Sequence, residues 1–473
     1  MMKYFTVIST VCVLILFGLN SFVMAVSNDG PIVSEKNKLD KMQLIQDKKS
    51  GQLRLVNRSE QQQVQALLPV STPKVIQNDD SSLSMALTMH PLPATAAYVN
   101  SYGEVKIYYG SVPVEVLTLP DNMAAQEGLI EASLKGPEIQ ACISDDEDEP
   151  TSSSTVNNGE QLANIVICSS DFQGDENQSG EGFYDPTPVE AVGGNMATTL
   201  GEQRQNVFLE AARIWGKELL SDVTIYVNAS FTPLTCSENS GVLGSAEPNY
   251  IHSNFDNAPQ ADTWYVGALA NSLSGQILAK NADIDARFNS NIDYNDDCLN
   301  GINWYLGLDG KNNKDMDLLT VVLHEMAHGL GFISLVDVAD GSLRLGEVNG
   351  EEVRYHDIWD HYLYGVRLGT WLNLTDEQRA YSATRDNNLV WQGENVTLHA
   401  SAYSEGVHEL GLFKMYAPNS VELGSSVSHF DKSVTPNTLM EPEFTEHTTD
   451  VGLAGALLED IGWLRPAAST LAQ

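Results

Sequence analysis

Three side chains that could carry metal chemistry lie close together in one apolar stretch. His324, Glu325 and His328 form the pattern His-Glu-x-x-His within residues 318–332. A helix turns about 100° per residue, so the two histidines lie on one face, one turn apart, and can bind the same metal ion. Glu325 projects beside them and can take a proton from a metal-bound water without being a ligand. The pattern predicts a catalytic zinc site on a buried helix.

A catalytic zinc site of this kind needs a third protein ligand. Gly331 can end the helix in a left-handed conformation and turn the chain back under the metal. Ser334 stands where the commonest pattern has a third histidine, and a serine hydroxyl is a poor zinc ligand. The ligand must therefore come from further along the chain. The candidates are His356, His361, His399, His408, His429 and His447, with Glu347 as the choice for a site of two His and one Glu.

The local sequence distinguishes among these candidates. His429 lies in a Gly- and Ser-rich stretch ahead of Pro436, where a loop can fold back on the metal. His356 and His361 lie in an aromatic run, and a five-residue spacing does not place both on one face of a helix. The residues favour His429 and leave the other candidates open.

Three segments together resemble the leishmanolysin-type metzincin peptidases. They are His-Glu-Met-Ala-His-Gly-Leu-Gly-Phe at 324–332, Gly-Ser-Ser-Val-Ser-His at 424–429 and Leu-Met-Glu-Pro at 439–442. The resemblance implies that His429 is the third zinc ligand, displaced by an insertion, and that Met440 lies beneath the metal in a Met-turn. It also implies a terminal helix near residues 451–461. Glu441 departs from the family's turn and adds a carboxyl group near the cleft.

These residues predict a zinc endopeptidase that acts on protein or peptide substrates. Three neutral imidazoles leave one zinc position open for a water, whose pKa the metal lowers towards neutrality. Glu325 takes the proton of that water and returns it to the leaving amine of the cleaved peptide bond. One catalytic Zn²⁺ is therefore expected.

The alternative is a secreted surface or adhesion protein that binds zinc or Ca²⁺ without catalysis. Closed structural zinc sites usually have four protein ligands, often Cys. For calcium, Asp293, Asn295 and Asp297 have the spacing of the first three EF-hand ligands. Cys298 then stands where the loop needs Gly, and Trp304 where it needs Glu, so an ordinary solvated loop is the better interpretation.

The pattern of helices and strands predicts an α+β fold. Apolar residues recur at helical spacing over 200–220, residues 223–227 and 284–288 alternate as strands, and 315–330 form the helix of the zinc motif. Strand-like alternation also occurs at 105–109 and 112–116. We expect a metzincin-like catalytic domain with a twisted sheet, an active-site helix and an irregular C-terminal subdomain, preceded by a β-rich N-terminal region.

The chain is predicted to have four parts. Residues 1–25 have the charge, apolar run and small-residue end of a signal peptide, and the run is shorter than the roughly 20 residues that span a bilayer. Export of a secreted chain without a transmembrane segment is expected. Residues 26–165 form a propeptide or accessory region that ends near an acidic linker. Residues 166–331 and 332–473 form the two catalytic subdomains.

The N-terminal region 26–165 has two interpretations. As a propeptide it is removed near the acidic residues 145–155 before full activity appears, and the thiolate of Cys142 can hold the open zinc position. As a permanent β-rich domain it keeps Cys142 bonded to Cys168. The sequence does not choose between them.

Charge and cysteine content limit the partners and the compartment. The chain has 473 residues with 26 Lys and Arg against 63 Asp and Glu, a net charge of −37 that repels nucleic acid. After removal of the signal peptide four cysteines remain, an even number that favours two disulfides in an exported chain. Neighbour pairing would join Cys142 to Cys168 and Cys236 to Cys298, although four cysteines permit three connectivities.

Overall fold

The computed structural model describes residues 75–78, 82–87, 162–174, 178–346, 351–443 and 446–466, and the backbone alone of 44–46, 53–55, 94–99, 105–109, 347–348 and 444. The chain divides into two compact units, Met1–Val70 and Ser71–Gln473. In the first, β1 (Leu44–Gln46) and β2 (Leu53–Leu55) form an antiparallel pair. The predicted signal peptide, the acidic linker, Cys142 and the strand expected at 112–116 lie outside the described residues.

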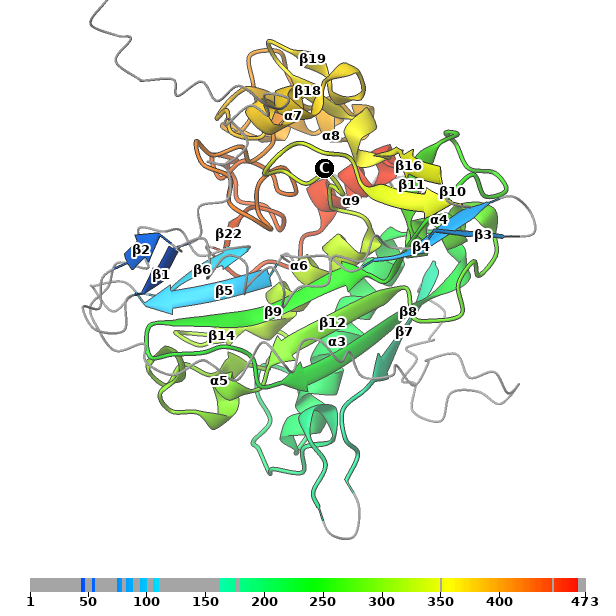
Figure 1. Cartoon of the computed structure of the whole chain (residues 1–473). Coiled ribbons are helices and arrows are strands. Elements are labelled where there is room, and N and C mark those ends of the chain that lie inside the picture. Colours follow the sequence, from blue (N-terminus) through cyan, green and yellow to red (C-terminus); the bar gives the residue numbers. More distant parts are fainter. Residues whose placement is uncertain are drawn as a thin grey trace, which may run out of the picture. The chain divides into compact units, whose positions relative to one another are not determined.

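Seven strands form the central sheet of the second unit: β5 (Ala94–Val99), β6 (Val105–Tyr109), β7 (Ala163–Ser169), β8 (Ser221–Thr232), β9 (Ser240–Pro248), β12 (Ile284–Asn289) and β22 (Glu443–Phe444). Their order is β22-β6-β5-β9-β12-β8-β7 (Figure 1). Strands β7, β8 and β12 are parallel, whereas β9, β5, β6 and β22 continue the sheet in antiparallel pairs. The strands predicted at 105–109, 223–227 and 284–288 are confirmed.

Two helices pack side by side on this sheet. Helix α3 (Leu200–Glu218) makes the crossover between β7 and β8, and α6 (Leu318–Leu330) lies against β9 and β12. The side chain of Thr199 caps α3, and the buried indole N–H of Trp215 donates to the carbonyl of Leu323, 3.1 Å away. Both predicted helices are confirmed, although α6 starts at Leu318 rather than at 315. Asp317 is its N-cap, which leaves Asp315 outside the helix.

A second sheet has five strands, and its order is β17-β11-β10-β4-β3. These strands are β3 (Val75–Gln77), β4 (Leu83–Ala86), β10 (Tyr250–Ser253), β11 (Thr263–Val266) and β17 (His356–Asp357). Helix α4 (Gly267–Ser274) follows β11 and contacts α6. Residues before 110 therefore add strands to both sheets.

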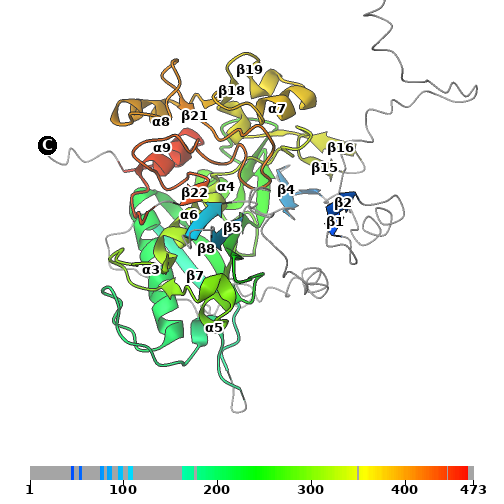
Figure 2. The same cartoon turned by 90° about the vertical axis from the view of Figure 1, so that its left-hand side faces the viewer.

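Short elements joined by long loops make up the C-terminal part. They are β15 (Leu345–Val348), β16 (Glu351–Arg354), β18 (Leu363–Gly365), β19 (Gly369–Thr370), β20 (Leu389–Trp391), β21 (Phe413–Lys414), α7 (Asp376–Ser382), α8 (Glu394–Leu398) and α9 (Gly452–Asp460). In Figures 1 and 2, β18, β19, α7 and α8 lie together above α9. The helix expected near 451–461 is confirmed as α9, and the unit is a mixed α+β fold as predicted.

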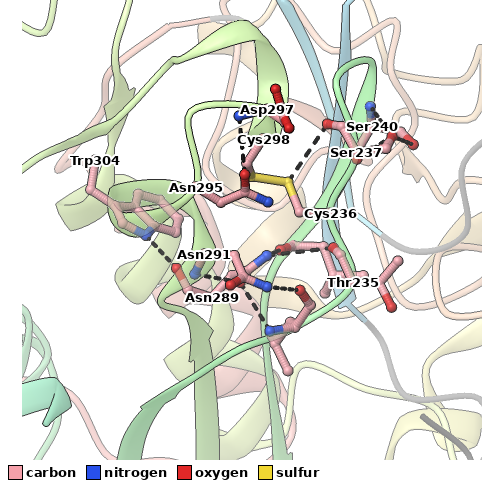
Figure 3. Close-up of a disulfide and its surroundings, with 12 residues drawn as sticks. Thr235, Cys236, Ser237, Ser240, Asn289, Asn291, Asn295, Asp297, Cys298 and Trp304 are labelled. Carbon is pink, nitrogen blue, oxygen red and sulfur yellow. Dashed lines mark hydrogen bonds between the residues drawn. A yellow bond between two sulfur atoms is a disulfide. The ribbon is translucent and has the colours of Figure 1, made fainter. Parts of the chain in front are cut away.

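A disulfide and two asparagines fix the connection between β8 and β9 (Figure 3). Cys236 is bonded to Cys298, as predicted. The side chain of Asn289 donates to the carbonyl of Val242 and that of Asn291 to the carbonyl of Leu234. Cys168 is also disulfide-bonded. The start of β9 is therefore held by covalent and polar contacts.

Within the part of the chain that the structure describes, no helix has both the length and the apolar character needed to cross a bilayer.

The close approach of α6 to the sheet depends on Gly329, and Gly329→Ala should displace the helix. A Cβ at Gly329 would lie 2.5 Å from Cγ2 and 2.8 Å from Cδ1 of Ile284 on β12. We expect the substitution to lower the free energy of unfolding by about 1–3 kcal/mol, the usual cost of overpacking a core. Ile284→Ala removes the opposing atoms, so the double variant should lose less than the sum of the two single changes. Urea unfolding measures these free energies. If the losses of the two single variants simply add in the double variant, the contact between residues 329 and 284 does not limit the packing of α6.

Candidate metal centre

Helix α6 carries His324, Glu325 and His328, and all three side chains are buried. The carboxylate of Asp317 accepts the N–H of Thr320 at 2.8 Å and so caps the start of the helix. Gly331 ends it in the left-handed region, at φ 118°, as predicted from its place after His328. The indole N–H of Trp463 donates to the carbonyl of Leu330 at 2.9 Å. The helix is therefore fixed at both ends.

The three histidines named for the zinc site meet at one point. Nε2 of His324 lies 3.1 Å from Nε2 of His328 and 3.1 Å from Nε2 of His429. The three rings are almost completely buried. Within the described residues, they are the one group of metal-ligating side chains whose donor atoms all lie within 4.8 Å of one another.

Backbone carbonyls determine which nitrogen of each ring carries the proton. Nδ1 of His324 donates to the carbonyl of Leu439, that of His328 to Phe332 and that of His429 to Ser425, at 2.7, 2.7 and 2.9 Å. A carbonyl only accepts, so in the neutral ring the lone pair is on Nε2. Three lone pairs therefore face one another and repel. A cation bound between them would remove this repulsion, because all three lone pairs could coordinate it.

Burial keeps the three rings neutral. It lowers the pKa of His328 to about 4 and holds the pKa of His324 and of His429 well below the ordinary value, with the neighbouring imidazoles adding to both shifts. Neutral imidazole is the form that ligates a metal.

The loop that brings His429 to α6 is held by backbone pairing. The N–H of Tyr416 donates to the carbonyl of His429, and the N–H of Val427 donates back to the carbonyl of Tyr416. Val427 has a φ of 73°, an unusual conformation for a β-branched residue, and it is buried. The hydroxyl of Ser428 accepts the N–H of Ser334 at 3.1 Å. Ser334, which stands where a third histidine was sought, thus anchors the loop that supplies one.

Met440 and Glu441 lie in the next turn. Met440 is fully buried, and its carbonyl accepts the N–H of Phe430, next to His429. Glu441 is also buried and accepts the N–H of Thr438. Burial, supported by neighbouring carboxylates, raises the pKa of Glu441 to about 8. At neutral pH this carboxyl group is therefore protonated and adds no charge to the site.

Glu325 is positioned by the central sheet. Its Oε2 accepts the N–H of Ala246 on β9 at 3.0 Å, and the side chain is buried. The hydrogen bond orients one edge of the carboxylate from a strand distant in sequence. This places the predicted proton acceptor beside its two neighbouring histidines on α6.

The other candidate ligands lie elsewhere. His356 Nδ1 contacts Asp360 Oδ2 at 2.6 Å, His361 lies near Thr263, and His447 contacts Asp317. His399 and His408 are likewise not part of the His324, His328 and His429 group, and the side chain of Glu347 lies outside the described residues.

Of the three residues considered for calcium, Asn295 and Asp297 are exposed, whereas Asp293 has a buried partner. Asp293 forms an ion pair with the buried Arg204, with 2.7 Å between Oδ2 and Nη2. It lies at the end of the short helix α5 (Asn291–Tyr294). The expectation of a solvated loop is therefore wrong for Asp293, because a buried guanidinium needs a charged partner.

Sequence reasoning missed the backbone groups that orient the site. Two of them have a recognisable spacing: the carbonyl of Phe332 lies four residues after His328, and that of Ser425 four residues before His429. The amide of Ala246 and the carbonyl of Leu439 have no local signal, because any residue supplies a backbone group.

The residues present fit zinc. Four-coordinate zinc with bonds of about 2.0–2.1 Å to His nitrogens requires ligand nitrogens roughly 3.3 Å apart, close to the spacing found here. Three neutral nitrogen donors also suit zinc better than they suit magnesium or calcium. Comparison with known protein families, curated proteins and solved structures finds no match to this chain.

Replacement of His429 should distinguish a metal ligand from histidines that lie outside the triad. We expect His429→Ala to lower zinc affinity at least about a hundredfold, more than loss of a group that only orients a ligand. His356→Ala and His361→Ala serve as controls, because neither ring belongs to the triad, and they should keep about one zinc per chain. Metal analysis after dialysis against buffered zinc measures this. Full occupancy in His429→Ala would rule out the assignment.

Glu441→Gln should change how stability depends on pH. The folded pKa of about 8 exceeds the ordinary 4.5, so the stability contributed by the carboxyl is complete below pH 4.5 and is lost as pH rises through 8. The neutral Gln avoids this loss. The variant should therefore gain stability relative to wild type by up to about 1.4 kcal/mol per pH unit within that window. Urea unfolding at several pH values, with the exposed Glu238→Gln as control, tests it; a pH-independent difference contradicts it.

Proposed function

We propose that this protein is an exported zinc-dependent endopeptidase of the leishmanolysin type within the metzincins. The observation that carries the proposal is the convergence of three neutral imidazole nitrogens, 3.1 Å apart for two of the pairs, beside a buried glutamate held by the N–H of Ala246. Three nitrogen ligands with an adjacent carboxylate are typical of hydrolytic zinc sites.

The chain's own residues have distinct tasks in this reaction. When bound by His324, His328 and His429, zinc supplies Lewis acidity and lowers the pKa of a coordinated water. Glu325 accepts the proton of the attacking water and returns it to the leaving amine. The amide of Ala246 keeps the Glu325 carboxylate in one orientation. The carbonyls of Leu439, Phe332 and Ser425 keep each imidazole aimed at the same point.

Several features support the metzincin type. The helix of the motif ends at Gly331 in a left-handed turn, and the third histidine is brought back by a loop far along the chain. Met440 is buried in the turn that follows. Its neighbour Leu439 supplies the carbonyl that binds His324. This contact supports the proposal that the turn lies beside the metal.

Export is supported by the cysteines. Cys236 and Cys298 form a disulfide and Cys168 is in a disulfide as well. Such bonds persist in oxidising compartments. The rival, a zinc-binding surface protein without catalysis, would have the same metal site and would differ only in the role of Glu325.

Glu325→Gln decides between these functions. The variant should retain about one zinc per chain, because Glu325 is not a ligand, and should lose about 10²–10⁴-fold in hydrolysis of unfolded casein, since proton transfer is removed. Glu238→Gln, an exposed change of the same kind, is the control. Chelation should abolish the activity, and added zinc should restore it. A zinc-loaded wild type without peptidase activity would favour the surface-protein alternative, and an active Glu325→Gln would exclude the mechanism.

A further inference from the structure

A cavity lies in the C-terminal part of the chain, and none of the three triad histidines lines it. It is partly open, and its empty space is about 380 Å³. Its walls come from the end of β18, the end of α7 and the turn that precedes β20, and β18 and α7 lie together in Figure 1. Residues that line it include Val366, Arg367, Leu368, Tyr381, Ser382 and Arg385.

Hydrogen bonds hold the walls of this cavity in place. The N–H of Val366 donates to the carbonyl of Asn388 at 2.8 Å, and the N–H of Asn388 donates to the carbonyl of Arg385 at 3.0 Å. The indole N–H of the buried Trp371 donates to Oγ of Ser382 at 3.2 Å. The cavity is therefore a fixed feature of the fold, as sites for small ligands usually are.

Two arginines of this cavity, Arg367 and Arg385, have no carboxylate partner among the described residues. The chain has 63 Asp and Glu against 26 Lys and Arg, so carboxylates far outnumber basic groups. Other arginines of the chain do form ion pairs, namely Arg204, Arg213, Arg287, Arg379 and Arg465. The positive charge beside the cavity is thus left for a ligand.

The guanidinium group of Arg385 lies over the ring of Tyr381, 4.0 Å from the ring centroid. Its Nε is buried and has no hydrogen-bond partner in the part of the chain that the structure describes. The Nε atoms of Arg204 and Arg465 also have no partner, but a carboxylate binds the Nη2 of each. Arg385 has neither contact. A buried donor without an acceptor is unfavourable, and a bound anion would supply the acceptor.

Neighbouring groups do not account for both arginines. Asp386 follows Arg385, but its pKa is raised by burial and by Asp431 and is lowered by Lys432, so the charges that act on it lie on another loop. A positive charge just beyond the C-terminal end of α7 is favourable, which explains Arg385 and leaves Arg367 unexplained. The net charge of −37 opposes an anion only weakly, because salt screens charges beyond about 8 Å at physiological ionic strength.

We propose that this cavity binds the carboxylate group of an organic acid, held by Arg367 and Arg385. A guanidinium group presents a planar pair of N–H donors that matches the two oxygens of a carboxylate. Val366 and Leu368 add aliphatic surface, which favours a ligand with carbon next to its carboxylate over an inorganic anion. A free carboxylic acid and the acidic side chain of a peptide both present this group. The inference does not depend on the proposed peptidase function.

Substitutions of the two arginines test the site. Arg367→Gln and Arg385→Gln each remove one charge, whereas Arg385→Lys keeps the charge and loses the planar fork. Arg354→Gln is the matched control, because Arg354 is an exposed arginine on β16 that does not line the cavity. Arg367 is exposed, so its variant remains informative if loss of the contact between Arg385 and Tyr381 destabilises the fold.

The first measurement is calorimetric titration of the full chain with glutarate at low salt. Wild type and Arg354→Gln should bind glutarate with equal affinity, and both other Gln variants should bind it at least about tenfold more weakly, with Arg385→Lys between them. Glutaramide, the uncharged diamide, should not bind. Affinity for glutarate that is unchanged in Arg367→Gln and Arg385→Gln would overturn the proposal, since the ligand would then lie elsewhere. Sulfate that binds as tightly as glutarate would overturn the assignment to an organic acid.

The second measurement distinguishes the two sources of the carboxylate. The probes are a rhodamine-labelled peptide Ala-Leu-Glu-Leu-Ala with a blocked C-terminus and its counterpart with Gln in place of Glu, followed by anisotropy in the Glu325→Gln chain. Binding of the Glu peptide at least about tenfold tighter than that of the Gln peptide, and lost in Arg385→Gln, would identify an acidic peptide as the ligand. Binding of glutarate alone would identify a free acid. If neither glutarate nor the Glu peptide binds in a way that depends on Arg367 or Arg385, the proposal is wrong. Neither readout uses hydrolysis, so failure of the peptidase function would leave this result unchanged.

Discussion

The meeting of three imidazole nitrogens is the constraint on which the rest of the structure depends. Neutral nitrogens whose lone pairs face one another at 3.1 Å repel, and the rings are buried as well. Each ring is held there by a carbonyl acceptor for its Nδ1–H, and α6 is in turn held by Trp215 and Trp463, whose indoles donate to its carbonyls. A metal ion bound between the three nitrogens would recover the free energy that this arrangement costs, because a cation satisfies all three lone pairs at once.

Local periodicity was enough to predict the first half of the site. His324, Glu325 and His328 lie on one helix. The spacing of the two histidines predicts their shared face, and Gly331 predicts where the helix ends. His429 could be preferred but not selected from its surroundings alone, because a loop contact between distant segments leaves no periodic signal. The amide of Ala246 had no signal at all. The predicted start of α6, residue 315, lies three residues before the observed start at Leu318. Asp315 and Asp317 both suit the first turn of a helix, whereas only Asp317 caps this one.

Buried carboxyl groups give this acidic chain a defined pH preference. Burial raises the pKa of Asp283 and of Asp360 to about 7, and that of Glu441 to about 8. Each keeps a proton in the folded chain that the unfolded chain releases, so each contribution to stability is lost as pH rises. Self-repulsion from a net charge of −37 acts in the same direction, since fewer carboxyls are ionised at lower pH. These carboxyl groups therefore favour folding as the pH falls towards 7, whereas the lowered pKa values of the buried His252 and His328 oppose folding as the pH falls below 6.5.

The N-terminal strands are attached in two different ways, and this bears on where a functional boundary can fall. On β4, Met85 is fully buried and the hydroxyl of Ser84 lies 2.8 Å from Nδ1 of His252, whose pKa burial lowers to about 4. Removal of β4 would expose that ring and open the core of the second sheet. The β5–β6 hairpin instead lies between β9 and β22 in the central sheet and pairs with both strands. Loss of β4 would therefore disturb the packed core of the second sheet, whereas loss of the hairpin would remove main-chain pairing from the central sheet, so the N-terminal region need not act as one piece.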